Sequence, residues 1–72
     1  MLPSRRVPAV GARAGVRHFG GELEPATIVE VRDGGRSVVV ACADGTAREF
    51  TLRRATASFI ERGAQHAPLL EL

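Results

Sequence analysis

The chain has 72 residues, enough for one small domain, and its single cysteine excludes a disulfide within the monomer. Neither that cysteine, Cys42, nor the histidines His18 and His66 lie at a spacing typical of metal ligands, which argues against a structural metal ion. No apolar run is long enough to span a membrane, and the first residues lack the apolar middle of a secretory signal, so we expect a cytoplasmic protein.

The net charge of +2 is unevenly distributed along the chain. Residues 1–21 contain four arginines and no acidic residue, whereas residues 22–72 contain six arginines against eight acidic residues and are therefore net acidic. Prolines and a glycine interrupt any pattern near the start. We therefore expect residues 1–14 to form a flexible basic arm and residues 15–72 to form the folded domain.

The first half of the domain predicts two strands. Residues 15–19 are expected to form a short strand that ends at Gly20 and Gly21, and residues 22–25 read as a loop. The strongest signal follows in residues 26–32, which are rich in β-branched side chains and are bounded by turn residues. This segment is predicted to be the second strand.

Two glycine-containing turns predict an antiparallel meander. Asp33-Gly34-Gly35 and Asp44-Gly45 supply residues that tolerate the positive φ of tight hairpin turns. They separate the strand at residues 26–32 from further strands at residues 37–43 and 48–53. The last of these alternates polar and apolar side chains with a period of two, as a half-buried strand does.

The alternation along these strands predicts which side chains face the core. In the strand at residues 26–32, we expect Val29 and Val31 to point inward and Ile28 to point outward. The other side chains expected inside are Val16, Val38, Val40, Cys42, Phe50 and Leu52.

The segment at residues 53–62 permits two structures. Apolar residues at helical spacing predict a short helix or 3-10 turn that ends before Gly63, and the same residues permit a tight turn at residues 54–57 followed by a short strand at residues 58–62. Residues 69–72 then supply a closing edge strand. The expected fold is all-β, a small barrel of five or six antiparallel strands.

The order of these parts resembles that of the small SH3-like barrels, and the pattern of strands and turns is most similar to that of the KOW and Tudor-like groups. The resemblance covers residues 15–72 and depends on a first strand that starts with Gly15 and on the segments PATIVEV, RSVVVACADG and REFTL. The ending FTLRRATASFIERG is also similar to that of small uncharacterised bacterial proteins. The resemblance implies a curled sheet and implies no activity, because this fold carries many unrelated functions.

No group of residues predicts catalysis or cofactor binding. Cys42 reads as a small apolar core residue, and His18 has no carboxylate or thiol at a meaningful spacing. Asp33 and Asp44 precede glycines in turns, where carboxylates accept backbone hydrogen bonds. Three phenylalanines without tryptophan or tyrosine argue against grooves for proline-rich peptides, methyl-lysine cages and base-stacking surfaces. We expect no enzyme, no metal site and no small-molecule substrate.

A non-enzymatic binding module is the function that remains. We expect a small adaptor or assembly subunit that acts through contact with a protein partner or with a second copy of itself. The apolar residues expected to stay outside the core for such contact are Phe19, Ile28 and Leu69.

The alternative is a nucleic-acid-binding accessory protein that uses its arginines. They begin in the arm and continue across one sheet edge, as Arg5, Arg6, Arg13 and Arg17, then Arg32, Arg36, Arg53 and Arg54. Folded nucleic-acid modules usually carry a basic face, and the body of this chain is net acidic, so protein contact ranks first.

Overall fold

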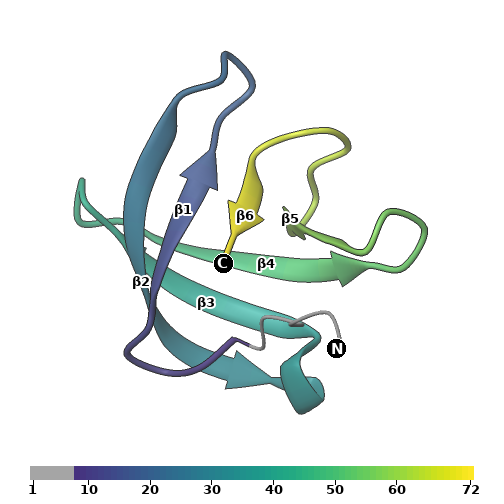
Figure 1. Ribbon diagram of the computed structural model, residues 1–72, viewed down its shortest axis with the longest axis horizontal. Coiled ribbons are helices and arrows are strands. Elements are labelled where there is room, and N and C mark those ends of the chain that lie inside the picture. Colours follow the sequence, from purple (N-terminus) through teal and green to yellow (C-terminus); the bar gives the residue numbers. More distant parts are fainter. Residues whose placement is uncertain (1–7) are drawn as a thin grey trace, which may run out of the picture.

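Six antiparallel strands follow one another around a closed barrel, and the last strand returns to pair with the first (Figure 1). The computed structural model describes residues 8–72. The elements are β1 (Arg13–Arg17), β2 (Leu23–Arg32), the 3-10 turn η1 (Asp33–Gly35), β3 (Ser37–Cys42), β4 (Ala47–Arg53), β5 (Ser58–Glu61) and β6 (Leu69–Glu71). The prediction of an all-β barrel with a central three-stranded meander is confirmed, and the topology is compatible with an SH3-like barrel.

The β1–β2 hairpin is longer than the sequence predicts. β1 begins at Arg13, two residues before the expected start of the first strand, and β2 includes residues 23–25, which read as a loop. Glu24 and Pro25 have low strand propensity, but the pairing of Leu23 with Arg17 extends the ladder through them. Pairing between distant residues therefore decides the length of this hairpin.

A β-bulge in β2 reverses two of the predicted side-chain orientations. The register of β2 against β3 shifts between Ile28 and Glu30, which leaves Val29 as the extra residue. Ile28 is only 1% exposed and Val29 is 48% exposed, so the prediction of Ile28 outside and Val29 inside is wrong. Beyond the bulge the alternation resumes, and Val31 packs against the core as predicted.

The core fills the centre of the barrel with aliphatic side chains and two phenylalanines. Its buried members are Val16, Ala26, Ile28, Val38, Val40, Cys42, Phe50, Phe59, Ile60 and Leu70. The inward positions predicted at Val16, at Phe50 and along β3 are confirmed. Leu52 was also expected inside, and this is wrong, because Leu52 lies one layer closer to the end of the barrel than Phe50 and is 38% exposed.

Both glycine turns of the meander are present. Between β3 and β4, Gly45 has a φ of 88° and donates its N–H to the Cys42 carbonyl oxygen at 3.0 Å. Between β2 and β3 the chain forms η1, in which Asp33, Gly34 and Gly35 all have positive φ. Glycine adopts left-handed conformations easily, which explains the Gly-Gly pair at this turn.

Of the two structures considered for residues 53–62, the turn followed by a strand is correct. Residues 54–57 form the turn, and β5 pairs with both β4 and β6. β6 closes the barrel against β1, as the prediction of a closing strand requires. In residues 8–72, no helix is long and apolar enough to cross a membrane.

Candidate functional site

Four arginines of the barrel are paired with acidic residues. The pairs are Arg17 with Glu71 (2.9 Å), Arg48 with Glu61 (3.0 Å), Arg62 with Glu49 (3.5 Å) and Arg32 with Glu30. The hydrogen bond between Arg17 and Glu71 raises the pKa of the guanidinium and lowers the pKa of the carboxyl group. Arg17 and Arg32 were predicted to lie on a nucleic-acid path, and the structure gives both of them acidic partners instead.

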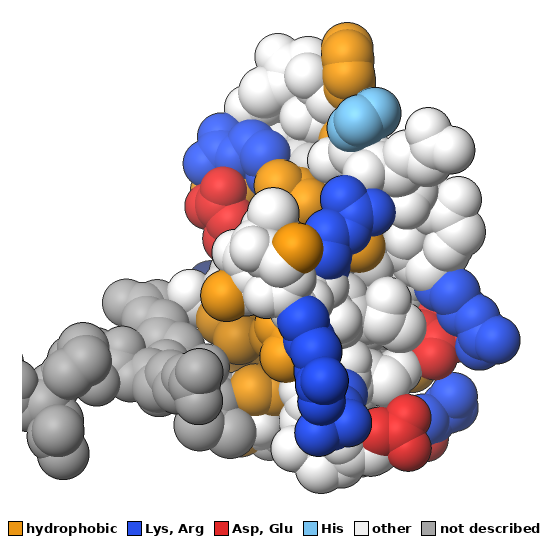
Figure 2. Space-filling view, turned by 90° about the vertical axis from the view of Figure 1, so that its right-hand side faces the viewer, with side chains coloured by type: hydrophobic (Ala, Val, Ile, Leu, Met, Phe, Trp, Pro, Cys, Tyr) orange, Lys and Arg blue, Asp and Glu red, His pale blue; other side chains and the backbone are white. Residues whose placement is uncertain are grey.

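The other described arginines form no salt bridge within residues 8–72, and they are Arg13, Arg36, Arg53 and Arg54. The last three lie at the same end of β3 and β4, where the Arg36 carbonyl oxygen accepts a hydrogen bond from the Leu52 N–H at 2.8 Å. We call Arg36, Arg53 and Arg54 the arginine end. Figure 2 looks onto this side of the barrel and shows arginine side chains in the middle of the view, the lower of them next to an acidic side chain, with further arginine and acidic side chains side by side at the left and right. The predicted residues Arg5 and Arg6 lie outside the described residues.

The outer side of the β1–β2 hairpin carries exposed apolar side chains. Phe19, at the tip, is 86% exposed, and Leu23 is 50% exposed. Pro25 and Val29 are exposed farther along β2. We call Phe19, Leu23, Pro25 and Val29 the hairpin face. In Figure 1 the hairpin rises to the top of the view, so that its tip extends beyond the other strands.

A shallow depression of about 320 Å³ lies beside this face. Its lining includes Gly15, Leu23, Pro25 and Leu72. Gly15 makes room for the Leu23 side chain, since a Cβ atom at position 15 would lie 2.6 Å from Leu23 Cδ1. Leu23 therefore packs directly on the backbone of β1 and forms one wall of the depression.

The predicted protein-contact residues have three different outcomes. Phe19 is exposed as expected, and Leu69 is half-buried in β6. Ile28 is wrong as a contact residue, because the β2 bulge turns it into the core. Sequence reasoning missed Leu23, which was assigned to a loop, and Val29, which was assigned to the core. Alternating apolar residues from Leu23 onward were the available signal, but the neighbouring proline and glutamates favoured a loop.

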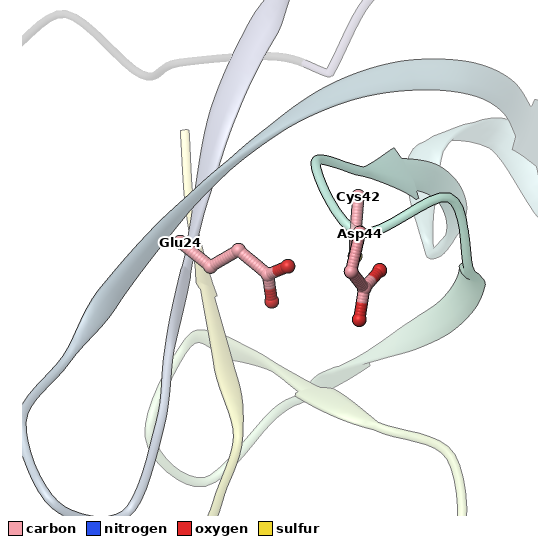
Figure 3. A group of neighbouring side chains, drawn as sticks. All are labelled: Glu24, Cys42 and Asp44. Carbon is pink, nitrogen blue, oxygen red and sulfur yellow. The ribbon is translucent and has the colours of Figure 1, made fainter.

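Polar residues gather at the opposite end of β3, beside the β3–β4 turn (Figure 3). Three of them each offer one possible metal-ligand atom, and these atoms lie within 4.8 Å of one another: Glu24 from β2, Cys42 at the end of β3 and Asp44 in the turn. His18 Nε2 lies 2.9 Å from Glu24 Oε1. The expectation that His18 has no carboxylate partner is wrong, because the hairpin brings Glu24 back beside it. We call these four residues the barrel mouth.

The barrel mouth is largely explained by contacts within the chain. Asp44 Oδ1 accepts hydrogen bonds from the Thr46 N–H at 3.0 Å and the Thr46 hydroxyl at 2.6 Å, which confirms its role as a turn residue. The Thr46 hydroxyl holds the pKa of Asp44 below its ordinary value. Burial raises the pKa of the Cys42 thiol, which packs in the core as predicted. A metal ion held by Glu24, Cys42 and Asp44 would require the Cys42 thiolate, which this burial disfavours.

Comparison with known proteins gives no match to a family model, to a curated protein or to a solved structure. Three features of the described chain remain as starting points for a function. The hairpin face is apolar, the arginine end is basic, and the barrel mouth is internally paired.

Proposed function

We propose that this protein is a non-enzymatic binding module, a small adaptor or assembly subunit that holds another protein surface against the hairpin face. The exposure of Phe19 is the observation that carries the proposal. Aromatic side chains are enriched at protein interfaces, and they contribute a large contact area at a small cost in conformational entropy.

An ordered turn supports Phe19 at the tip of the hairpin. His18 donates its N–H to the Glu22 carbonyl oxygen at 2.8 Å, and Gly21 donates its N–H to the His18 carbonyl oxygen at 2.9 Å. A supported anchor loses less conformational freedom when a partner binds than an anchor on an unstructured loop. The turn therefore favours a role for Phe19 in contact rather than in a flexible linker.

Apolar side chains make up the hairpin face, and the charges beside it are Arg17, Glu71 and Arg13, of which Arg13 lines the depression and forms no salt bridge within residues 8–72. Arg17, which lies opposite Leu23 in the hairpin, is neutralised by Glu71. Binding through the hairpin face should therefore persist at high salt, because the hydrophobic effect is not screened by ions.

A binding role also suits the size and the resemblance of the chain. A domain of about 70 residues gains little net stability from its core, and a bound partner adds stability by mass action. The pattern of strands and turns, which resembles that of the KOW and Tudor-like groups, fits a binding role, although this fold does not specify the partner.

The test compares Phe19→Ser/Leu23→Ser with Val10→Ser in the full chain. Val10 is 67% exposed and lies outside the hairpin, so it is a control for the loss of an exposed apolar side chain elsewhere on the chain. Each protein is captured from nuclease-treated native lysate at high salt, and each purified protein is measured by light scattering at several concentrations.

We expect the wild type and Val10→Ser to retain the same protein partner or the same self-association. The double variant should lose at least about tenfold in affinity, equal to about 1.4 kcal/mol. A wild-type protein that stays monomeric and retains no partner after nuclease treatment would contradict the proposal. So would a double variant that binds as tightly as the wild type.

A further inference from the structure

We infer that the arginine end is a second binding surface, which holds the phosphate backbone of double-stranded nucleic acid. Arg36, Arg53 and Arg54 lie at one end of β3 and β4, while the barrel mouth lies at the other. The inference does not depend on the hairpin face, which belongs to the β1–β2 hairpin.

The acidic residues of the chain do not neutralise this surface. All eight lie between positions 22 and 71, within the described residues, and four of them pair with Arg17, Arg32, Arg48 and Arg62. Glu24 contacts His18, and Asp44 bonds to Thr46. Asp33 is the exception, because its carbonyl oxygen accepts a hydrogen bond from the Arg36 N–H at 3.3 Å and its carboxylate lies in η1, beside the arginine end. Asp33 therefore offsets part of the charge of the three arginines, and the arginine end stays net positive.

A backbone contact places the three residues at the same end of β3 and β4. The hydrogen bond from the Leu52 N–H to the Arg36 carbonyl oxygen joins the start of β3 to the end of β4, and Arg53 and Arg54 follow Leu52 directly. Arg53 Nη1 donates to the Gln65 carbonyl oxygen at 2.9 Å, which orients this guanidinium without neutralising its charge. Arg36 and Arg54 are exposed.

Guanidinium chemistry favours phosphate as the ligand. A guanidinium group is planar and presents paired N–H donors that match two oxygens of one phosphate. Several such groups on one surface release condensed counterions when they bind a nucleic-acid backbone, and this release supplies the affinity.

The aromatic residues favour a duplex over a single strand. Single-strand binding uses aromatic platforms on which bases stack. Phe50 and Phe59 are buried, and Phe19 lies at the tip of the β1–β2 hairpin. No aromatic side chain of the described chain therefore accompanies the arginines, and contacts to phosphates alone make binding independent of base sequence.

The described chain begins beside this surface. Pro8 lies next to η1, since a Cβ atom at Gly35 would be 3.9 Å from Pro8 Cγ. Arg5 and Arg6 precede Pro8 in the sequence and lie outside the described residues. Their contribution is measured with a separate variant.

The test is fluorescence anisotropy of the full chain with two short DNA duplexes of unrelated sequence, over a series of salt concentrations. We expect equal affinity for both duplexes and a slope of log K against log salt of about −2.7, from about −0.9 for each of three phosphate contacts. Arg54→Gln should weaken binding about five- to tenfold at roughly 0.1 M salt and make the slope less steep by about 0.9. The triple variant of Arg36, Arg53 and Arg54 to glutamine should show no binding that depends on salt.

Two matched variants separate this surface from net charge. Arg17→Gln removes the same charge from an arginine paired with Glu71, and it should leave binding within about twofold of the wild type. Asp33→Asn removes a negative charge close to Arg36 in the chain, and asparagine tolerates the positive φ of position 33. It should therefore tighten binding. Thermal unfolding followed by circular dichroism checks that each variant is folded.

Four results would overturn the inference. The triple variant could bind as tightly as the wild type, or Arg17→Gln could weaken binding as much as Arg54→Gln. A polyglutamate peptide of matched charge could bind as tightly as the duplex, which would indicate an acidic protein ligand. Arg5→Gln/Arg6→Gln could abolish binding that each single variant of Arg36, Arg53 and Arg54 leaves intact. Phe19→Ser/Leu23→Ser leaves the three arginines in place, so it should bind the duplex as tightly as the wild type. Its duplex affinity therefore tests the arginine end independently of the proposed function of the hairpin face.

Discussion

The two ends of β3 and β4 differ in whether their charged groups have partners within the chain. At the barrel mouth, Glu24 contacts His18 and Asp44 bonds to Thr46, so the polar groups contact one another. At the arginine end, Arg36, Arg53 and Arg54 have no acidic partner within residues 8–72. The two ends belong to the same strands, so strand propensity does not explain the difference.

This contrast separates groups that support the fold from groups left open to a ligand. A hydrogen-bonded polar group recovers what it loses when water is removed from it. Clustered cations without partners repel one another, and this repulsion is reduced when an anion binds. We therefore expect changes at the mouth to alter stability and changes at the arginine end to alter binding.

Ile28→Ala and Val29→Ala should set the scale for this comparison, with the largest expected effect. Ile28 fills the core and Val29 is the exposed bulge residue, although they are neighbours in the chain. We expect Ile28→Ala to reduce the free energy of unfolding by about 2–4 kcal/mol and Val29→Ala to change it by less than about 0.5 kcal/mol. Urea denaturation measures both values, and similar losses for the two variants would show that the bulge is misplaced.

Arg48→Met and Arg54→Met should sharpen the comparison between the two classes of arginine. Arg48 Nη1 donates to Glu61 at 3.0 and 3.2 Å, so the methionine variant leaves a half-buried carboxylate without its cation. We expect Arg48→Met to cost about 1–2 kcal/mol, and Arg54→Met to stay within about 0.5 kcal/mol of the wild type. Equal stability of the two variants would break the distinction between paired and unpaired arginines.

The pH dependence of stability should show the smaller contribution of the paired carboxylates. Hydrogen bonds from Thr46, Ser37 and Arg17 lower the pKa values of Asp44, Glu49 and Glu71 respectively. A carboxylate with a lowered folded-state pKa adds stability that is fully present above its ordinary pKa, which is 3.8 for aspartate and 4.5 for glutamate. This stability is lost as the pH falls through the lower folded-state pKa, so the unfolding midpoint should decrease in acid.

Asp44→Asn provides the specific variant for this pH prediction. An asparagine side chain retains an oxygen that can accept the hydrogen bonds from Thr46, but it does not titrate. Its unfolding midpoint should therefore decrease less in acid than that of the wild type, in thermal melts between roughly pH 6 and pH 2. Asp33→Asn is the control, because the Asp33 carboxylate accepts no hydrogen bond from Thr46. If the unfolding midpoints of both variants decreased in acid by the same reduced amount, the role of the Thr46 hydrogen bond would be rejected.

The sequence predicted the parts of the fold that short-range patterns encode. Glycine at position 45 marked a turn, the period of two in β4 placed Phe50 inside, and the β-branched run marked β2. Phe19 was expected outside the core and is exposed. Two of the predictions that failed depend on register: Ile28 and Val29 exchanged faces at a bulge, and Leu23 became part of a strand through its pairing with Arg17. Leu52 keeps the predicted alternation but is exposed because it lies near the end of the barrel.

By itself, the sequence determined the all-β class, the meander and most of the core, because alternation and turn chemistry act within a few residues. Tertiary structure decided which charges meet. The pairs of Arg17 with Glu71 and of Arg48 with Glu61 join residues far apart in the chain, and no local pattern predicts them. Net charge is a sum over the whole chain, whereas an electrostatic surface depends on distances that only the closed barrel fixes. Residues 22–72 are therefore net acidic as a whole, although they also contain the positive arginine end.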